Sequence, residues 1–213
     1  MPLEIVTIPC LADNYTFLLH DKASGETAVI DVPESAPIAA ELHKRGWTLS
    51  HVFLTHHHFD HIDGLDELLK DHPATVVGAA NDAHRLPKLD VAVSEGDSIT
   101  VGGESVQVID VSGHTVGHIA YYFPDTDAVA TGDSLMALGC GRLFEGTAEQ
   151  MWDSLSKLAA LPEGTIVMSG HEYTLANAKF AMSIEPGNVA LQTRLEENKT
   201  DRESGTPTVP SLL

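Results

Sequence analysis

A run of histidines with one aspartate constrains this chain more than any other feature. The segment 55–61 reads Thr-His-His-His-Phe-Asp-His and places four imidazoles and a carboxylate within six positions. It directly follows a β-rich stretch, so we expect it at the end of a strand. Residues two apart point to the same side of an extended chain, so His56 and His58 are expected to face one metal ion together. Nitrogen and carboxylate ligands suit zinc, with iron or manganese as alternatives.

The other members of this run have different expected positions. Asp60 continues the alternation of His56 and His58, and His61 follows where the chain turns. His57 should point the opposite way, so we interpret it as a non-ligand. A solvated polar loop is the structural alternative for the whole run, and the density of histidine argues against it.

Three further sites pair a glycine with a residue type that binds metals. His114 follows Gly113, Asp133 follows Gly132, and His171 follows Gly170, each just beyond an expected strand. A glycine there lets the backbone turn sharply. Taken singly, Asp133 has an alternative as a helix N-cap, and each histidine has one as a polar turn residue. Together with the run they supply seven candidate ligands, enough for two metal ions sharing one carboxylate: His56, His58, Asp60, His61, His114, Asp133 and His171.

The remaining histidines have structural interpretations. His118 lies four residues after His114, a spacing that chelates a metal on a helix, but the glycines around it argue against a helix. We therefore expect His118 to have a structural or supporting role. The isolated histidines are expected at the surface: His20, His43, His51, His72 and His84.

Short strands and helices alternate along the chain. Strands are expected at 3–8, 15–20, 27–32, 50–55, 105–111, 119–123, 128–131 and 165–169. Helices are expected at 35–44, 65–70, 147–161, 175–184 and 189–198. In the third helix we expect one apolar face, formed by Met151, Trp152, Leu155, Leu158 and Ala159. Strands followed by helices, twice over, predict a layered α/β sandwich with its helices outside the sheets.

Composition excludes several classes of partner. The 213 residues carry a formal charge of -19, from 31 acidic and 12 basic side chains. Binding to nucleic acid or to an anionic membrane surface needs the opposite sign, so neither partner is expected. No apolar run is long enough to span a bilayer, and the start of the chain does not look like a signal peptide. Cys10 and Cys140 are too few for a disulfide framework, so we expect free thiols and a cytoplasmic location. We also expect a monomer.

These motifs together resemble those of the metallo-β-lactamase superfamily. The run from His56 to His61, followed by the Gly113, Gly132 and Gly170 motifs, carries the resemblance. Within the superfamily the chain is similar to the glyoxalase II family. That closer resemblance rests on the segments 13–15 (Asp-Asn-Tyr), 139–147 (Gly-Cys-Gly-Arg-Leu-Phe-Glu-Gly-Thr), 170–174 (Gly-His-Glu-Tyr-Thr) and 208–211 (Thr-Val-Pro-Ser).

The resemblance implies a fold and a role for each site residue. The fold would be α/β, a four-layer αββα sandwich with a short C-terminal helical segment, divided into a catalytic domain at 1–172 and the segment at 173–213. Two divalent metals would be bound, one by His56, His58 and His114, the other by Asp60, His61 and His171, with Asp133 bridging them. Asp60 and Asp133 would thereby act in catalysis. Substrate contacts would come from Arg142, Leu143, Phe144, His171, Glu172 and Tyr173.

The implied activity is hydrolysis of a small-molecule glutathione thioester. S-D-lactoylglutathione would give D-lactate and glutathione, as in the degradation of methylglyoxal. Alternatives are an oxygenase with one iron, similar to a persulfide dioxygenase, a lactonase or β-lactamase, and a non-catalytic metal-binding remnant. The complete second ligand group and the glutathione-type motifs favour the hydrolase.

The chain departs from the family pattern in two places. The family usually has Gly-Gly after the histidine run, where this chain has Asp63-Gly64. We expect the extra carboxylate to adjust a hydrogen bond near the metals. The family also continues into a longer helical region with basic residues that bind glutathione, whereas this sequence ends at Leu213. We expect metal chemistry to be kept and substrate affinity to be affected.

Overall fold

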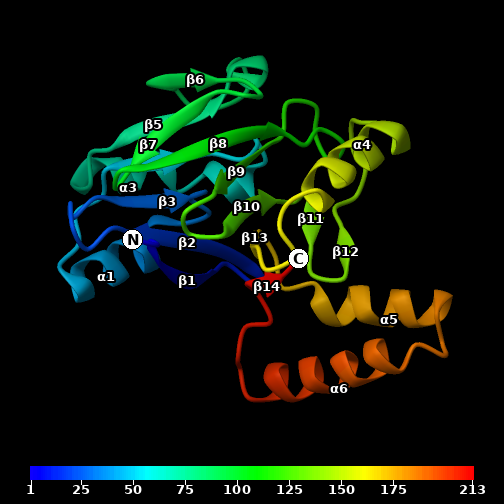
Figure 1. Cartoon of the computed structure of the whole chain (residues 1–213). Helices are drawn as coiled ribbons and strands as arrows, with labels where there is room; N and C mark the ends of the chain where they lie inside the picture. The colour runs from blue at the N-terminus through cyan, green and yellow to red at the C-terminus, as the bar shows by residue number, and fades with distance from the viewer.

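Two six-stranded sheets pack face to face in the computed structural model, which describes all 213 residues (Figure 1). The first sheet contains β1 (Glu4–Cys10), β2 (Asn14–His20), β3 (Thr27–Ile30), β4 (His51–Phe53), β5 (Thr75–Ala79) and β6 (Val91–Val93), in that order. The second has the order β14 (Ser211–Leu212), β13 (Ile166–Ser169), β10 (Ala128–Gly132), β9 (Ile119–Phe123), β8 (Glu104–Asp110) and β7 (Ser98–Val101). A separate hairpin joins β11 (Leu135–Met136) to β12 (Gly139–Cys140).

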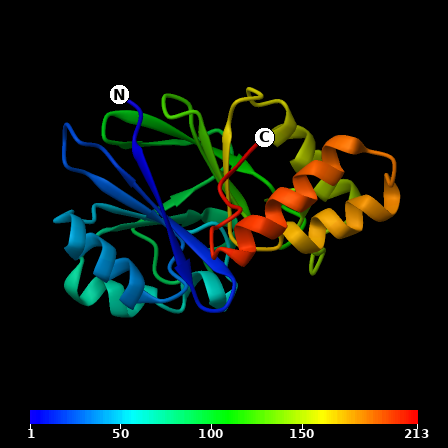
Figure 2. The same ribbon diagram turned by 90° about the horizontal axis from the view of Figure 1, so that it is seen from below.

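Helices cover the outer faces of both sheets. On the first sheet lie α1 (Ser35–Arg45) and α3 (Leu65–Asp71), and α4 (Ala148–Ala159) lies on the second (Figure 2). Leu42 of α1 is fully buried in the main core, and Leu158 of α4 packs with Val129 and Val167 of the second sheet. The predicted four-layer αββα sandwich is confirmed.

Aromatic side chains fill the space between the sheets. Phe53 of β4 meets Tyr121 and Phe123 of β9, with ring centroids 4.6 and 6.2 Å apart. Successive residues of a strand point to opposite faces, so the intervening Tyr122 faces the smaller core under α4. Every residue of β9 is therefore buried, which explains its continuous apolar sequence.

Strand direction brings the motif loops to one edge of the sandwich. The strands β3, β4, β5 and β6 run parallel, as do β10 and β13. The chain leaves β3 at Asp31, β4 just before His56, β10 at Asp133 and β13 just before His171. The carboxyl ends of parallel strands lie on the same edge, where loops on a rigid scaffold build a site.

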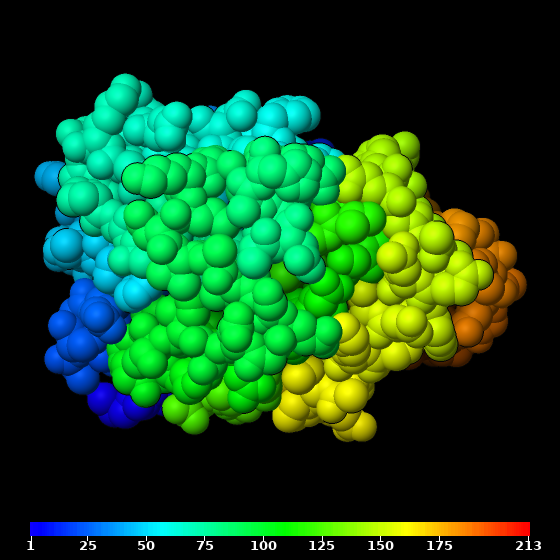
Figure 3. Space-filling model, turned by 90° about the horizontal axis from the view of Figure 1, so that it is seen from above, coloured from blue at the N-terminus to red at the C-terminus, as the bar shows by residue number.

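The last forty residues form a helical pair beside the sandwich. The helices α5 (Thr174–Ile184) and α6 (Val189–Glu203) pack against each other, and α5 also contacts β12. The chain then returns to the second sheet, where β14 pairs with β13 (Figure 1). Viewed from above, α5 forms a projection at one end of the molecule (Figure 3). None of the helices combines the length and the apolarity that a membrane crossing requires.

Some local expectations differ from the structure. The helix α6 extends to Glu203, five residues beyond the predicted end. The prediction stopped early because the last turn is polar and shows no apolar period. In α4 the expected apolar face is wrong in part. Trp152 is 71% exposed, and Ser154 takes a buried position by donating a hydrogen bond to the carbonyl of Ser112 at 2.7 Å.

His20 was expected at the surface and is instead buried. Its Nδ1 lies 2.9 Å from the hydroxyl of Thr27, and its ring stacks on Trp47 with centroids 4.0 Å apart. The hydroxyl and the indole supply a polar and an apolar partner from elements distant in sequence, which no local pattern of His20 reveals.

Candidate metal centre

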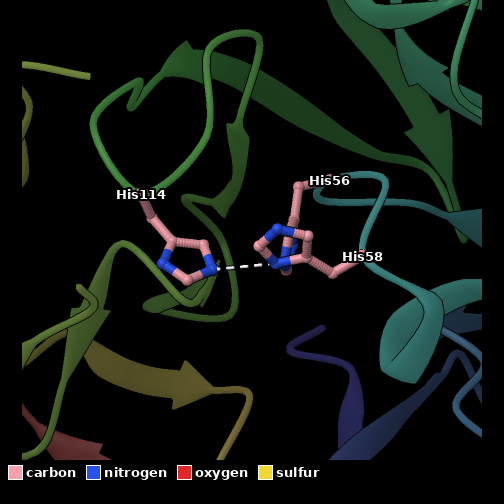
Figure 4. Close-up of side chains that lie close together, drawn as sticks. All are labelled: His56, His58 and His114. Atoms are coloured by element: carbon pink, nitrogen blue, oxygen red, sulfur yellow. Dashed lines mark hydrogen bonds between the residues drawn. The ribbon is translucent and has the colours of Figure 1, made fainter. Parts of the chain in front are cut away.

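Three histidines converge from two loops to form the first ligand group. His56 and His58 follow β4, and His114 lies in the loop after β8. Nδ1 of His58 lies 3.1 Å from Nε2 of His56 and 3.0 Å from Nε2 of His114 (Figure 4). Three ring nitrogens from three imidazoles therefore point at a common position, as the alternation argument predicts for His56 and His58.

A second group lies beside the first. Asp60 and His61 belong to the short helix α2 (Phe59–Ile62), and His171 follows β13. Nε2 of His61 lies 3.4 Å from Nε2 of His171, and Oδ2 of Asp60 lies 3.4 Å from the same His171 nitrogen. These three donors form a cluster that matches the second predicted ligand set.

Asp133 lies between the two groups. Its Oδ2 is 3.2 Å from Nε2 of His171 and 3.5 Å from Nε2 of His114, and its Oδ1 is 3.4 Å from Nε2 of His61. One carboxylate thus reaches ligands of both groups. The structure therefore brings all seven predicted side chains together at one edge of the sandwich.

Four of the five imidazoles, those of His56, His61, His114 and His171, donate the N–H of their other ring nitrogen to a fixed partner. His61 donates through Nδ1 to Asp31 at 2.8 Å, and His171 donates through Nδ1 to Asp13 at 3.3 Å. For His114 the acceptor is the carbonyl of Arg142 at 2.8 Å, and for His56 it is the hydroxyl of Thr55 at 3.0 Å. These bonds direct the Nε2 atoms of the four rings toward the centre, as is usual around metal-binding histidines, whereas His58 faces the centre with Nδ1.

Burial and neighbouring charge divide the histidines by pKa. Burial lowers the pKa of His56 well below its ordinary value and also lowers those of His58 and His114. The three are therefore neutral near pH 7, with lone pairs free. Burial opposes the charged form of His61 too, but Asp133 and Asp31 outweigh it and raise its pKa well above the ordinary value. The pKa of His171 is also raised, because Asp133 outweighs burial.

The Asp133 carboxylate is ionised despite its burial. Burial alone would raise the pKa of Asp133, but His61 and His171 hold it well below its ordinary value. Its Oδ1 is buried and makes no hydrogen bond, although Nε2 of His61 lies 3.4 Å away. A buried carboxylate oxygen without a donor is costly unless a cation accompanies it.

The donor set fits divalent cations. Imidazole nitrogens and carboxylate oxygens are the ligands of catalytic zinc sites, and neutral imidazole is the form that binds. The first group offers three neutral imidazoles, the second offers Asp60 with His61 and His171, and the Asp133 carboxylate lies between the two groups. The cluster therefore fits divalent metal ions.

A cavity of about 700 Å³ opens onto these ligands. Arg142, Phe144 and Tyr173 line it, together with the apolar side chains of Met136 and Phe59. Phe59 and Phe144 are 70% and 63% exposed, and both border the opening. A cavity lined in this way suits a small molecule with polar and apolar parts.

The sequence matches two family models that together cover most of the chain. A model described as the metallo-beta-lactamase superfamily matches residues 13–171, and one described as the hydroxyacylglutathione hydrolase C-terminus matches residues 172–213. The hydroxyacylglutathione hydrolase of Ruegeria pomeroyi is 64% identical over 213 residues, which are 100% of this chain and 84% of that protein. The chain belongs to the hydroxyacylglutathione hydrolase family.

Solved structures place this hydroxyacylglutathione hydrolase family member among metallo-β-lactamase folds. ETHE1 from Myxococcus xanthus is similar, with a TM-score of 0.71 and 36% identity over 81% of this chain and 76% of that chain. BLEG-1 B3 metallo-beta-lactamase gives a TM-score of 0.73, covering 79% of this chain and 91% of that chain. Its 24% identity supports the fold alone.

Two residues that we expected at the substrate of this family member lie outside the cavity wall. Leu143 lines an apolar groove on the α4 side, with Trp152 and Leu155. The carboxylate of Glu172 accepts hydrogen bonds from the hydroxyl of Tyr15 at 2.6 Å and from N of Thr208 at 3.0 Å. Glu172 therefore ties the returning C-terminal segment to β2, next to His171 and Tyr173.

The two non-ligand histidines have distinct surroundings. Nδ1 of His57 lies 2.8 Å from Oδ2 of Asp82, on the side away from the centre. His118 is completely buried, stacks on His56 with ring centroids 4.5 Å apart, and accepts a hydrogen bond from N of Asp133 at 3.2 Å. These placements agree with the non-ligand interpretation of His57 and with a supporting role for His118.

Asp63 was expected to adjust a hydrogen bond near the metals, and the structure contradicts this. Its side chain is exposed at the end of α2. The following Gly64 is required, because a Cβ there would lie 2.6 Å from Cα of Glu34.

Sequence reasoning missed Asp31 as a site residue. It lies just after β3 with a left-handed φ of 58°, and it supports both His61 and Thr55. An aspartate that directly follows an apolar strand was the available signal. Asp13, quoted only as part of a family motif, has the corresponding position behind His171.

Proposed function

We propose that this chain hydrolyses glutathione thioesters, with S-D-lactoylglutathione as substrate and D-lactate and glutathione as products. The position of Asp133 carries the proposal, because its two oxygens reach His61, His114 and His171 from both ligand groups. A carboxylate that reaches both groups is suited to hold two metal ions close together, as two-metal hydrolytic centres do. Membership of the hydroxyacylglutathione hydrolase family supports the substrate class.

We propose zinc as the resident metal, with two ions per chain. The first would be held by His56, His58 and His114, and the second by Asp60, His61 and His171, with Asp133 shared. Nitrogen-rich donor sets with one or two carboxylates suit zinc, and iron and manganese accept the same ligands. Divalent ions at such a centre lower the pKa of a water to near neutrality and stabilise negative charge that develops on oxygen.

The protein's own residues then position the reaction. Asp133 fixes the separation of the two ligand groups, and Asp31 and Asp13 hold His61 and His171 in the required tautomers. Hydrolysis adds water to the thioester carbonyl and breaks the carbon–sulfur bond. The leaving thiolate is stable near neutral pH, so a strong general acid is not needed.

The charge balance of the cavity favours recognition by Arg142. Glutathione carries carboxylates, and a chain with a net charge of -19 would otherwise repel an anionic substrate. The Arg142 side chain lines the cavity beside His114, while its backbone carbonyl is used by that histidine. Arg142 would bind a substrate carboxylate, and the hydroxyl of Tyr173 would donate a hydrogen bond to the glutathione part.

We also propose how the chain divides into domains and where the enzyme acts. Residues 1–172 would form the catalytic domain, and residues 173–213 would form the helical segment that supplies Tyr173 to the cavity. The enzyme would act as a monomer in the cytoplasm. The supporting observations are that one chain supplies all seven proposed ligands and that both cysteines are free thiols.

The test is hydrolysis of S-D-lactoylglutathione compared with other thioesters and lactones, with metal quantified on the same sample. We expect the glutathione thioester to give the highest kcat/KM by at least about tenfold. Higher activity on a lactone would contradict the proposed substrate class. Oxygen uptake with glutathione persulfide, without thioester hydrolysis, would identify an oxygenase instead. A metal-loaded protein that is inactive on every thioester would identify a non-catalytic metal-binding protein.

A further inference from the structure

A network of charged side chains lies behind the first ligand group and links three loops. Nε of Arg85 donates to the carboxylate of Asp82, and Nη1 of Arg85 lies 2.5 Å from Oε1 of Glu145. The third guanidinium nitrogen, Nη2, donates to the carbonyl of Val116 at 2.7 Å. On the other side, Asp82 pairs with His57 at 2.8 Å. We call His57, Asp82, Arg85 and Glu145 the Arg85 network.

Each loop joined by this network carries a residue of the proposed site. His57 lies between the ligands His56 and His58, so fixing its side chain outward fixes theirs inward. Val116 lies two residues after His114, and N of Val116 donates to Oε2 of Glu145 at 2.7 Å. Glu145 directly follows Phe144, which lines the cavity together with Arg142.

The geometry is specific to a guanidinium. Arg85 uses Nε, Nη1 and Nη2 for three different acceptors on three segments. Arginine presents several donors in a rigid plane, which an ammonium group does not reproduce. Asp82 is completely buried, so its carboxylate depends on these two partners, Arg85 and His57.

The backbone is closely packed at the same point. Gly117 has a left-handed φ of 92°, and a Cβ there would lie 2.9 Å from Cβ of Asp82. The His114 loop therefore passes directly over Asp82. Movement of Asp82 would be transmitted both to this loop and, through His57, to the first one.

We propose that Arg85 and Asp82 are positioning residues. They hold the three-histidine group in a fixed position relative to the cavity edge that Arg142 and Phe144 form. Neither touches the reacting atoms. Loss of the network should loosen the first metal position and misplace Arg142 and Phe144 relative to substrate. The substrate part rests on the proposed thioester hydrolase function, whereas the metal part does not depend on it.

The test compares Arg85→Gln with Arg45→Gln. Arg45 is a matched control, because its side chain is 29% exposed like that of Arg85, and it also bridges two carboxylates, Glu4 and Glu41. It lies on α1. Mutation of residues that support metal ligands from outside typically changes the metal affinity by about 10–100-fold. We expect Arg85→Gln to release one of two bound zinc ions to a chromophoric chelator about tenfold faster than the parent. Arg45→Gln should release both ions at the parent rate.

Turnover gives a second readout that a purely structural role would not produce. Arg85→Gln should raise KM for S-D-lactoylglutathione severalfold more than it lowers kcat, and Arg85→Lys should restore part of the loss. Glu145→Gln, which leaves buried Asp82 paired, should shift zinc release and KM in the same direction by less. This milder variant decides the question if Arg85→Gln does not fold.

Parent-like zinc release and KM in Arg85→Gln and Glu145→Gln would overturn the proposal, even if both proteins melt at lower temperature. If the parent hydrolyses no glutathione thioester, the proposed function fails, but zinc release still decides the positioning role.

Discussion

Oδ2 of Asp31 lies 2.8 Å from Nδ1 of His61, and both side chains are almost completely buried. The same carboxylate accepts hydrogen bonds from N and from Oγ1 of Thr55, each at 2.8 Å. Because Thr55 in turn accepts from Nδ1 of His56, one carboxylate orients a histidine in each ligand group. Asp31 therefore couples the two halves of the candidate centre.

Asp31→Asn should weaken metal binding by about 10–100-fold, since an amide has one acceptor oxygen and cannot accept both from N of Thr55 and from Nδ1 of His61. Asparagine tolerates the left-handed backbone at this position, so the fold should be kept. Competition with a chromophoric chelator measures the affinity. Asp127→Asn is the matched control, because Asp127 is also left-handed with a φ of 52° but is exposed in the β9–β10 turn. Equal zinc affinity in the two variants would refute the coupling role.

Gly170→Ala should abolish the centre. A Cβ at this position would lie 2.5 Å from Oδ1 of Asp133 and 2.7 Å from Cε1 of His61. We expect loss of at least one metal equivalent and of most activity, measured by elemental analysis and thioester hydrolysis. Gly164→Ala makes the same change where nothing lies within 4 Å of the new atom, so it should match the parent. A fully active, metal-replete Gly170→Ala would show that this close packing is not required.

The ligand positions could be predicted from sequence because each combines local spacing with a strand end. His56 and His58 alternate in an extended stretch, while Asp133 and His171 each follow a glycine after a parallel strand. Asp31 also follows a strand end, but its role as a partner of the ligands could not be found this way, and neither could the Arg85 network. Their partners Thr55, His61 and Glu145 are distant in sequence, so only the packed structure shows the contacts.

Local periodicity also failed where side chains outside the element decide burial. Trp152 has the helical spacing of a core residue, yet it lies in an exposed groove beside Leu143. Similarly, Glu172 belongs to a motif associated with substrate, but Tyr15 and Thr208 engage its carboxylate. These outcomes depend on how the sandwich is packed by the 139–147 segment and by the C-terminal segment that returns to it at β14.

Metal binding should depend on pH more strongly in one half of the centre. The pKa values of His61 and His171 are raised, so a metal must displace their protons and binds more weakly as the pH falls. The pKa values of His56, His58 and His114 are lowered, so protons compete little there near neutral pH. Calorimetric titration of the metal-free protein with zinc at pH 6 and pH 8 should show one equivalent weakening at pH 6 much more than the other. Equal weakening of both equivalents would contradict this division.

Arg142→Ala should mainly raise KM for S-D-lactoylglutathione, by roughly tenfold, because the lost contact binds the substrate carboxylate in ground and transition states alike. Arg142→Lys keeps the charge and should recover part of the affinity. Steady-state kinetics on metal-replete proteins separates the parameters. A fall in kcat at constant KM would instead place Arg142 at the reacting centre.

The number of zinc ions bound tightly per chain tests the central claim most directly. The seven side chains, Asp133 among them, should hold two ions in the parent, and Asp133→Ala, which removes the shared carboxylate, should hold at most one. One ion or none in the parent, or two retained by Asp133→Ala, would contradict a centre bridged by this residue.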